Sequence, residues 1–253
     1  MSYKMLPFDQ YFLDTAEDYN HSQRSFRSPE YQSLRYPCGG KLHKLLGLQH
    51  EVNYALCYDP DRDAIQINFE KTMGFTDWFA NLEFEDEYYD AIDFEGQPLQ
   101  LRVHRGWAEM YLAVKRIIRT EWQRLHEAHA SAETEIIGWS LGSGQAMLCA
   151  QDLNYNFGLR ARVYTYGSVK PFRAKGAAET ERLDRYLAGL CVECRNFAEV
   201  NDVITYMPPF KGFRDLHRVT VALKPRSFWR LVNPWRYHTC YDNASLYREL
   251  PKE

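Results

Sequence analysis

The chain alternates short strand-like runs with longer stretches of helical periodicity. Apolar and polar residues alternate in 52–58 and 64–69, and the turn-forming residues 59–63 lie between them, which predicts a hairpin. From Gly106 onward, apolar residues recur with helical spacing at Met110, Leu112, Val114, Ile117, Ile118, Trp122 and Leu125. The same patterns predict strands at 101–104, 134–139, 161–166, 191–197 and 216–223, and helices at 144–153, 179–190 and 240–250.

This order of elements predicts an α/β fold. Strands that alternate with helices form a mostly parallel central sheet flanked by helices on both faces. No linker rich in proline, glycine or serine and no internal repeat divides the sequence. We therefore expect a single domain over residues 1–253, with a helical or irregular lead-in at 1–50 and the main α/β core at 51–253.

Charge and hydropathy narrow the functional classes. The chain has 34 acidic and 31 basic residues, a formal net charge of -3, whereas a nucleic-acid binder normally carries a basic surplus. We therefore expect no nucleic-acid partner. No window approaches the roughly 18 apolar residues of a membrane span, and the first residues do not form a secretory signal, so we expect a cytoplasmic protein.

The six cysteines do not form an evident metal or disulfide pattern. Cys191 and Cys194 have C-x-x-C spacing, but the sequence has no second pair to close a zinc site. On a strand, residues three apart point to opposite faces. Buried reduced thiols are the favoured interpretation, and no metal is predicted.

A serine stands in a sharp predicted turn between a strand and a helix. The motif Gly138-Trp139-Ser140-Leu141-Gly142 follows an apolar strand, and Ser143, Gly144 and Ala146 continue with small side chains. Such a turn exposes the central hydroxyl and directs the first backbone N–H groups of the helix toward a developing oxyanion. Ser140 is therefore the candidate nucleophile.

A nucleophilic serine needs a histidine base and a carboxylate to orient it. In α/β-hydrolases the chain order is serine, carboxylate, histidine. Asp202 follows a predicted parallel strand, whereas the competing Asp215 and Asp242 do not. His238, next to a predicted helix start, is preferred as the base over His217, which shares a strand face with apolar residues and is interpreted as a core histidine.

Several segments resemble the class 3 (fungal-type triacylglycerol) lipase family, a branch of the α/β-hydrolase superfamily. The resemblance runs from about residue 50 to the C-terminus. Its segments are IQINFEKTMGFTDWFANLEF, VHRGW, GWSLGSGQAM, VYTYGSVKPF and NDVITYMPP, followed by the late histidine.

The resemblance implies a role for each matching position. Ser140, Asp202 and His238 correspond to the triad, and His217 to a histidine outside it. Thr72 and Leu141 match the oxyanion hole. The lid and substrate contacts match Met73, Phe75, Trp78, Phe79 and Trp139. Two departures are that Glu70-Lys71 replaces the family's Arg-Gly, and Trp139 replaces its histidine beside the serine.

The leading hypothesis is a serine carboxylic-ester hydrolase, a lipase acting on acylglycerol-type lipid esters through an acyl-enzyme. It needs no metal or organic cofactor. Its expected partners are a lipid or small ester substrate and, transiently, a membrane surface. The alternatives are an acyltransferase or thioesterase on the same triad, and a catalytically inactive hydrolase-fold binding module.

Overall fold

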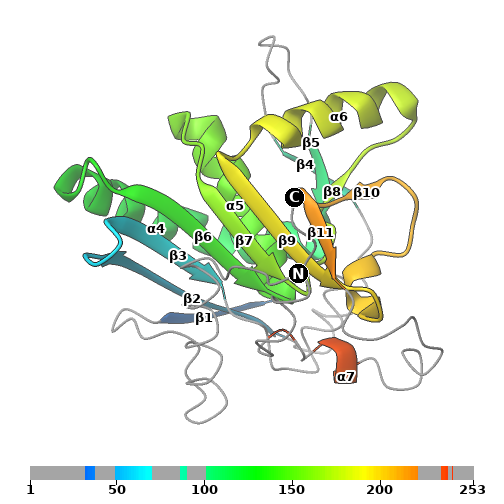
Figure 1. The fold of residues 1–253 in the computed structure, drawn as a ribbon, viewed down its shortest axis with the longest axis horizontal. Coiled ribbons are helices and arrows are strands. Elements are labelled where there is room, and N and C mark those ends of the chain that lie inside the picture. Colours follow the sequence, from blue (N-terminus) through cyan, green and yellow to red (C-terminus); the bar gives the residue numbers. More distant parts are fainter. Residues whose placement is uncertain are drawn as a thin grey trace, which may run out of the picture.

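The computed structural model describes residues 32–37, 49–69, 86–89, 101–221, 235–238 and 241 (Figure 1). Within these ranges, seven strands form the main sheet in the order β1-β2-β3-β6-β7-β9-β11. Their bounds are β1 Gln32–Pro37, β2 Gln49–Asp59, β3 Ala64–Phe69, β6 Glu133–Trp139, β7 Arg162–Tyr166, β9 Glu193–Glu199 and β11 Arg218–Val221. From β3 to β11 the neighbouring strands are parallel, and β1 and β2 are antiparallel to their neighbours.

This mostly parallel sheet is the α/β-hydrolase arrangement expected from the sequence. The predicted hairpin of β2 and β3 is confirmed, with Tyr54 opposite Phe69 and Asp59 opposite Ala64. The lead-in prediction for residues 1–50 is wrong at residues 32–37, because these form the edge strand β1. An edge strand has a partner on one side and needs less of the apolar alternation that identifies a buried strand.

A second, smaller sheet lies beside the first. It contains β4 Asp86–Tyr89, β5 Leu101–His104, β8 Phe172–Arg173 and β10 Phe213–Arg214, in the order β10-β8-β5-β4. Its strands pair antiparallel throughout. The strands β5 and β8 frame the entry to the long helix, because the His104 N–H donates to the Pro171 carbonyl at 2.8 Å.

Three helices follow the strands where the sequence predicts them: α4 Arg105–Ala128, α5 Leu141–Phe157 and α6 Ala177–Gly189. The 3-10 turn η1 Val203–Tyr206 and the short helix α7 Trp235–His238 were not predicted. The strands β6, β7 and β9 end on the side of the sheet where α7 lies (Figure 1). Among the helices in the described ranges, none is both long enough and apolar enough to cross a membrane.

A buried carboxylate fastens α5 to α4. Asp152 is 1% exposed and accepts hydrogen bonds from the Tyr111 hydroxyl at 2.8 Å and from Arg119 Nε at 2.8 Å. Lys115 Nζ lies 3.2 Å from the same carboxylate. Because α5 begins directly after Ser140, this contact also positions the helix that follows the candidate nucleophile.

We expect Asp152→Asn to lower the free energy of unfolding by about 2–3 kcal/mol, since it leaves two cations at a buried site without their carboxylate. Urea denaturation measures the change. Asp184→Asn is the matched control, because Asp184 pairs with Arg214 on the surface, where side chains are 53% and 37% exposed. It should change stability by less than about 0.5 kcal/mol. Equal losses in the two variants would contradict the structural role of Asp152.

Candidate active site

Ser140 occupies a strained turn between β6 and α5. Its backbone has φ 55° and ψ −122°, a region that residues with a Cβ rarely adopt and that is found mainly at functional sites. The turn is held from both sides. The Ser140 N–H donates to the Tyr166 carbonyl at 2.8 Å, and the Ser143 N–H donates to the Ser140 carbonyl at 3.0 Å.

Gly138 lets α5 begin this close to β6. A Cβ atom at Gly138 would lie 2.6 Å from the Gly142 carbonyl oxygen and 2.7 Å from Ser143 Cα, which is closer than real Cβ contacts allow. The strand and the helix are therefore in backbone contact. The small residues around Ser140 predict this close approach from the sequence.

The Ser140 side chain begins a chain of hydrogen bonds. Ser140 Oγ lies 2.6 Å from His238 Nε2, and His238 Nδ1 lies 2.8 Å from Asp202 Oδ2. Because an ionised carboxylate only accepts, Nδ1–H donates to Asp202 and Nε2 is left to accept the serine proton. His238 is 3% exposed and Asp202 is fully buried, so bulk water does not compete for the bond between them.

Asp202 accepts hydrogen bonds on both carboxylate oxygens. It lies beyond the carboxyl end of β9 and caps η1, where Oδ1 accepts the Ile204 N–H at 3.0 Å. Oδ2 accepts the Tyr241 hydroxyl at 2.8 Å as well as His238. Donors on both oxygens stabilise the charged carboxylate and hold it in one orientation.

Tyr241 is a site residue that the sequence reasoning missed. It is fully buried, and its hydroxyl oxygen accepts the Glu199 N–H at 2.9 Å while its proton goes to Asp202. No local pattern identified it, because its partners Glu199 and Asp202 lie 42 and 39 positions earlier in the chain. Tyr241 thus connects the histidine segment to the end of β9.

Gly167 follows β7 and faces the same cluster. Its φ is 60°, and a Cβ there would lie 2.8 Å from Tyr241 Cε2 and 3.0 Å from His238 Cε1. The Asp202 Oδ2 atom would be 3.2 Å away. The absence of a side chain at this position therefore makes room for the histidine and the carboxylate.

The competing histidine lies elsewhere. His217 is exposed and precedes β11, so its interpretation as a core histidine is wrong, because the strand begins one residue later at Arg218. It lines a surface pocket with residues from the start of β9, whereas Asp202 lies beyond the end of that strand. The competing Asp215 accepts hydrogen bonds from Arg218 and Asn196.

His238 differs from its expected setting. It was predicted to lie in a loop before a helix, but it is the last residue of the short helix α7. Asp242 and the predicted helix at 240–250 lie outside the described residues, apart from Tyr241.

The predicted oxyanion and lid residues are described only in part. Leu141 begins α5, where backbone N–H groups have no carbonyl partner inside the helix and favour negative charge. Trp139 ends β6 and is 8% exposed. The remaining residues of these two groups lie outside the described ranges: Thr72, Met73, Phe75, Trp78 and Phe79.

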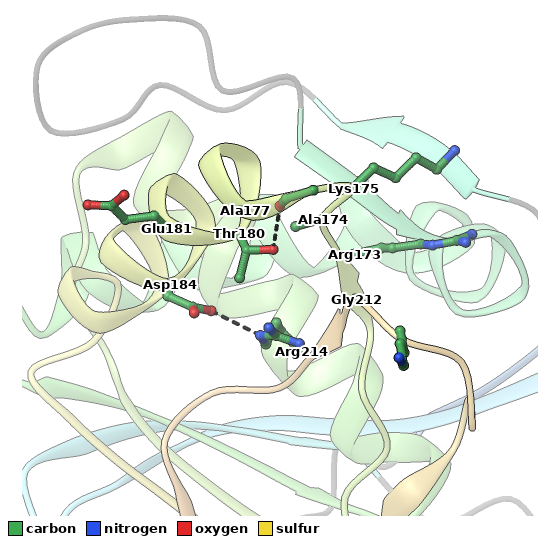
Figure 2. A pocket seen from close by; sticks show the side chains of 11 residues that line it. Arg173, Ala174, Lys175, Ala177, Thr180, Glu181, Asp184, Gly212 and Arg214 are labelled. Carbon is green, nitrogen blue, oxygen red and sulfur yellow. Dashed lines mark hydrogen bonds and ion pairs between the residues drawn. The ribbon is translucent and has the colours of Figure 1, made fainter.

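A larger pocket, of about 730 Å³, lies at the start of α6. Figure 2 shows Arg214 turned toward Asp184 and the Thr180 hydroxyl bonded to the chain before the helix. None of the predicted site residues that the structure describes lines it. Within the described part of the chain, moreover, no group of three histidine, cysteine or acidic side chains is arranged to hold a metal ion.

Solved lipase structures share this fold. The triacylglyceride lipase of Rhizomucor miehei is 16% identical, with a TM-score of 0.62 over 87% of this chain and 82% of that one. Lipase II from Rhizopus niveus is 18% identical, with a TM-score of 0.62 over 88% and 83%. A triacylglycerol lipase from Penicillium expansum is 15% identical, with a TM-score of 0.53 over 69% and 65%.

The sequence comparison carries the family assignment. A search of curated proteins found no significant match. The family described as lipase (class 3) matches residues 67–212, which is more than half of the chain and includes both Ser140 and Asp202. The chain therefore belongs to the class 3 lipase family and is a serine hydrolase with the α/β-hydrolase fold.

Proposed function

We propose that the protein hydrolyses carboxylic esters of lipids, with Ser140 as nucleophile, His238 as general base and Asp202 as its orienting carboxylate. The observation on which this proposal depends is the unbroken path of hydrogen bonds from the partly buried Ser140 Oγ through the imidazole to the buried Asp202. The distances of 2.6 and 2.8 Å are within the range in which a base accepts a proton directly.

Acylation follows from this geometry. His238 Nε2 takes the hydroxyl proton as Ser140 Oγ attacks the ester carbonyl carbon, and the imidazolium that forms is stabilised by Asp202. The tetrahedral intermediate collapses when the carbon–oxygen bond to the alcohol breaks. His238 then returns the proton to the leaving alkoxide, and the acyl group remains on Ser140.

Deacylation repeats the same transfers with water. His238 removes a proton from the water as its oxygen attacks the acyl carbon, and it gives that proton to Ser140 Oγ as the ester bond to the enzyme breaks. In both steps the carbonyl oxygen becomes negative. The Leu141 N–H at the start of α5 is the described donor suited to stabilise it, and loss of one such donor typically costs ~10²–10³ in rate.

The lipid part of the proposal comes from the sequence and the family. The relatives named above are triacylglyceride and triacylglycerol lipases, and the apolar residues Phe75, Trp78 and Phe79 match the family's lid. An amphipathic segment with this composition lies in the headgroup plane of a lipid surface. We therefore propose acylglycerol-type esters as substrates, presented at a membrane or micelle, and a cytoplasmic location.

A fluorophosphonate probe tests the nucleophile. We expect it to label Ser140 in the folded wild-type protein and to leave Ser140→Ala unlabelled, as intact mass and peptide mapping would show. Turnover of a p-nitrophenyl ester should fall at least about 10³-fold in His238→Ala, because the serine loses its base. His217→Ala is the matched control and should keep normal turnover, since His217 is exposed and remote. The reverse result for the two histidines would refute the proposed triad.

A pair of glycine variants separates backbone strain from site geometry. Gly158 has φ 65°, and a Cβ there meets no described atom within 4 Å, whereas a Cβ at Gly167 collides with the site. Both Gly→Ala changes should cost about 1–2 kcal/mol of stability from the left-handed backbone. Gly167→Ala should in addition lower kcat at least about tenfold, while Gly158→Ala keeps it. An unchanged kcat in Gly167→Ala would show that Tyr241 and His238 can move away from the added methyl group without loss of catalysis, which would contradict the prediction.

The dependence of kcat/KM on acyl chain length tests whether the substrates are lipid esters. With p-nitrophenyl esters from acetate to palmitate, kcat/KM should rise with length, because each buried methylene contributes up to about 0.8 kcal/mol. Added lipid vesicles should increase turnover of the long esters, and Ser140→Ala gives the background rate. A maximum at the shortest esters, with no effect of vesicles, would identify an esterase for small soluble substrates instead.

A further inference from the structure

The pair Cys191 and Cys194 lies at a bend between α6 and β9. The helix ends at Gly189, the chain bends at Val192, and β9 begins at Glu193. Two hydrogen bonds hold the bend in place. The Val192 N–H donates to the Ala161 carbonyl at 3.0 Å, and the Arg160 side chain donates through Nη2 to the Cys191 carbonyl at 2.9 Å. The two cysteines therefore keep a defined relation to each other.

The bend brings the two thiols together. The expectation that they point to opposite faces of a strand is wrong, because Cys191 precedes β9 and only Cys194 lies within it. Both side chains line the same surface pocket. The neighbouring Cys191 thiol and burial both raise the pKa of the Cys194 thiol, as expected for two thiols that lie side by side. Both residues are free thiols in this structure.

A surface pocket gives access to the pair. Its volume is about 460 Å³, and both cysteines line it together with Asp215, Leu216 and His217, which precede β11. The other described free cysteines, Cys57 and Cys149, do not line this pocket, and Cys149 is fully buried in α5. A small reagent therefore reaches the C-x-x-C pair more readily than Cys149.

The chemistry of the pocket favours exchange over metal binding. Among the described residues, the two thiols and their neighbours do not form a three-ligand group suited to a metal ion. A sulfur–sulfur bond of ~2.05 Å needs the two Cα atoms within roughly 4.4–6.8 Å of each other. A bend at Val192 favours this approach, whereas a straight strand would hold positions 191 and 194 roughly 10 Å apart. Their separation of three positions in the sequence keeps the second thiol beside the first throughout the reaction.

We propose that Cys191 and Cys194 form a dithiol site that closes to an internal disulfide by exchange with a small-molecule disulfide such as glutathione disulfide. In the first step a protein thiolate attacks one sulfur of the reagent, forms a mixed disulfide and releases one glutathione as a thiolate. In the second step the other protein thiol displaces the second glutathione. One small disulfide is reduced to two glutathione molecules, which take up the two protons lost by the cysteines.

The site is independent of ester hydrolysis. The pair lies at the start of β9, whereas Asp202 lies beyond the other end of that strand, and seven strand residues span roughly 23 Å. The proposal uses no residue of the Ser140 site. The test of the dithiol site is therefore valid whether or not the protein hydrolyses lipid esters.

Peptide mapping tests the proposal without any mutation. Trypsin cleavage after Arg185 and Arg195 releases residues 186–195, which contain Cys191 and Cys194 and no other cysteine. We expect incubation of the full chain with glutathione disulfide, followed by iodoacetamide and non-reducing digestion, to yield this peptide about 2 Da lighter than its dithiol form and without alkyl groups. Reduction before alkylation should restore two alkylation sites.

Three variants provide the controls. Cys191→Ser and Cys194→Ser should each retain one glutathione on the remaining cysteine of the peptide, because the second thiol that releases it is missing. Cys57→Ser should form the internal disulfide like the wild type. Recovery of the wild-type peptide with two alkyl groups, with a persistent glutathione, or linked to a different cysteine peptide would overturn the proposal.

Discussion

Ser140 keeps a positive φ at the junction of β6 and α5 because its neighbours hold the turn from both sides. The Tyr166 carbonyl accepts a hydrogen bond from the Ser140 N–H, and Ser143 donates to the Ser140 carbonyl. Both backbone groups of the serine are therefore hydrogen-bonded within the protein. Gly138 allows the helix to touch the strand. The energy stored in this backbone conformation is offset by α5, most of which is buried and which Asp152 fastens to α4. The position of the Ser140 hydroxyl thus depends on contacts spread over two helices and two strands.

The parallel register then places the remaining groups. The strands β6, β7 and β9 are hydrogen-bonded neighbours that run in the same direction, so Ser140, Gly167 and Asp202 emerge at one edge of the sheet. His238 has no such backbone route, because it follows Asp202 by 36 positions and comes from α7. Its position depends on side-chain contacts with Ser140 and Asp202, and on Tyr241, which bonds to the end of β9 and to the same carboxylate.

The features readable from the sequence are those with a strong local signal. Apolar periodicity located the long helix and the buried strands, and the small residues around Ser140 predicted the turn. The strand β1 was not predicted, because an edge strand does not need the alternation of apolar and polar residues that identifies a buried strand. His217 was placed in the core because alternation was extended one residue beyond the start of β11. Tyr241 and the contact between Cys191 and Cys194 depend on how the chain bends in space, and the sequence pattern carries no signal for that.

The position of His238 in the chain also decides when the site can exist. Ser140, Gly167 and Asp202 are all synthesised before the histidine, and each belongs to a segment that pairs within the sheet. The base is added only with the segment that carries α7 and Tyr241. A nascent chain that ends before residue 238 therefore contains the nucleophile without its base, and the hydrogen-bonded path cannot form until His238 has been synthesised.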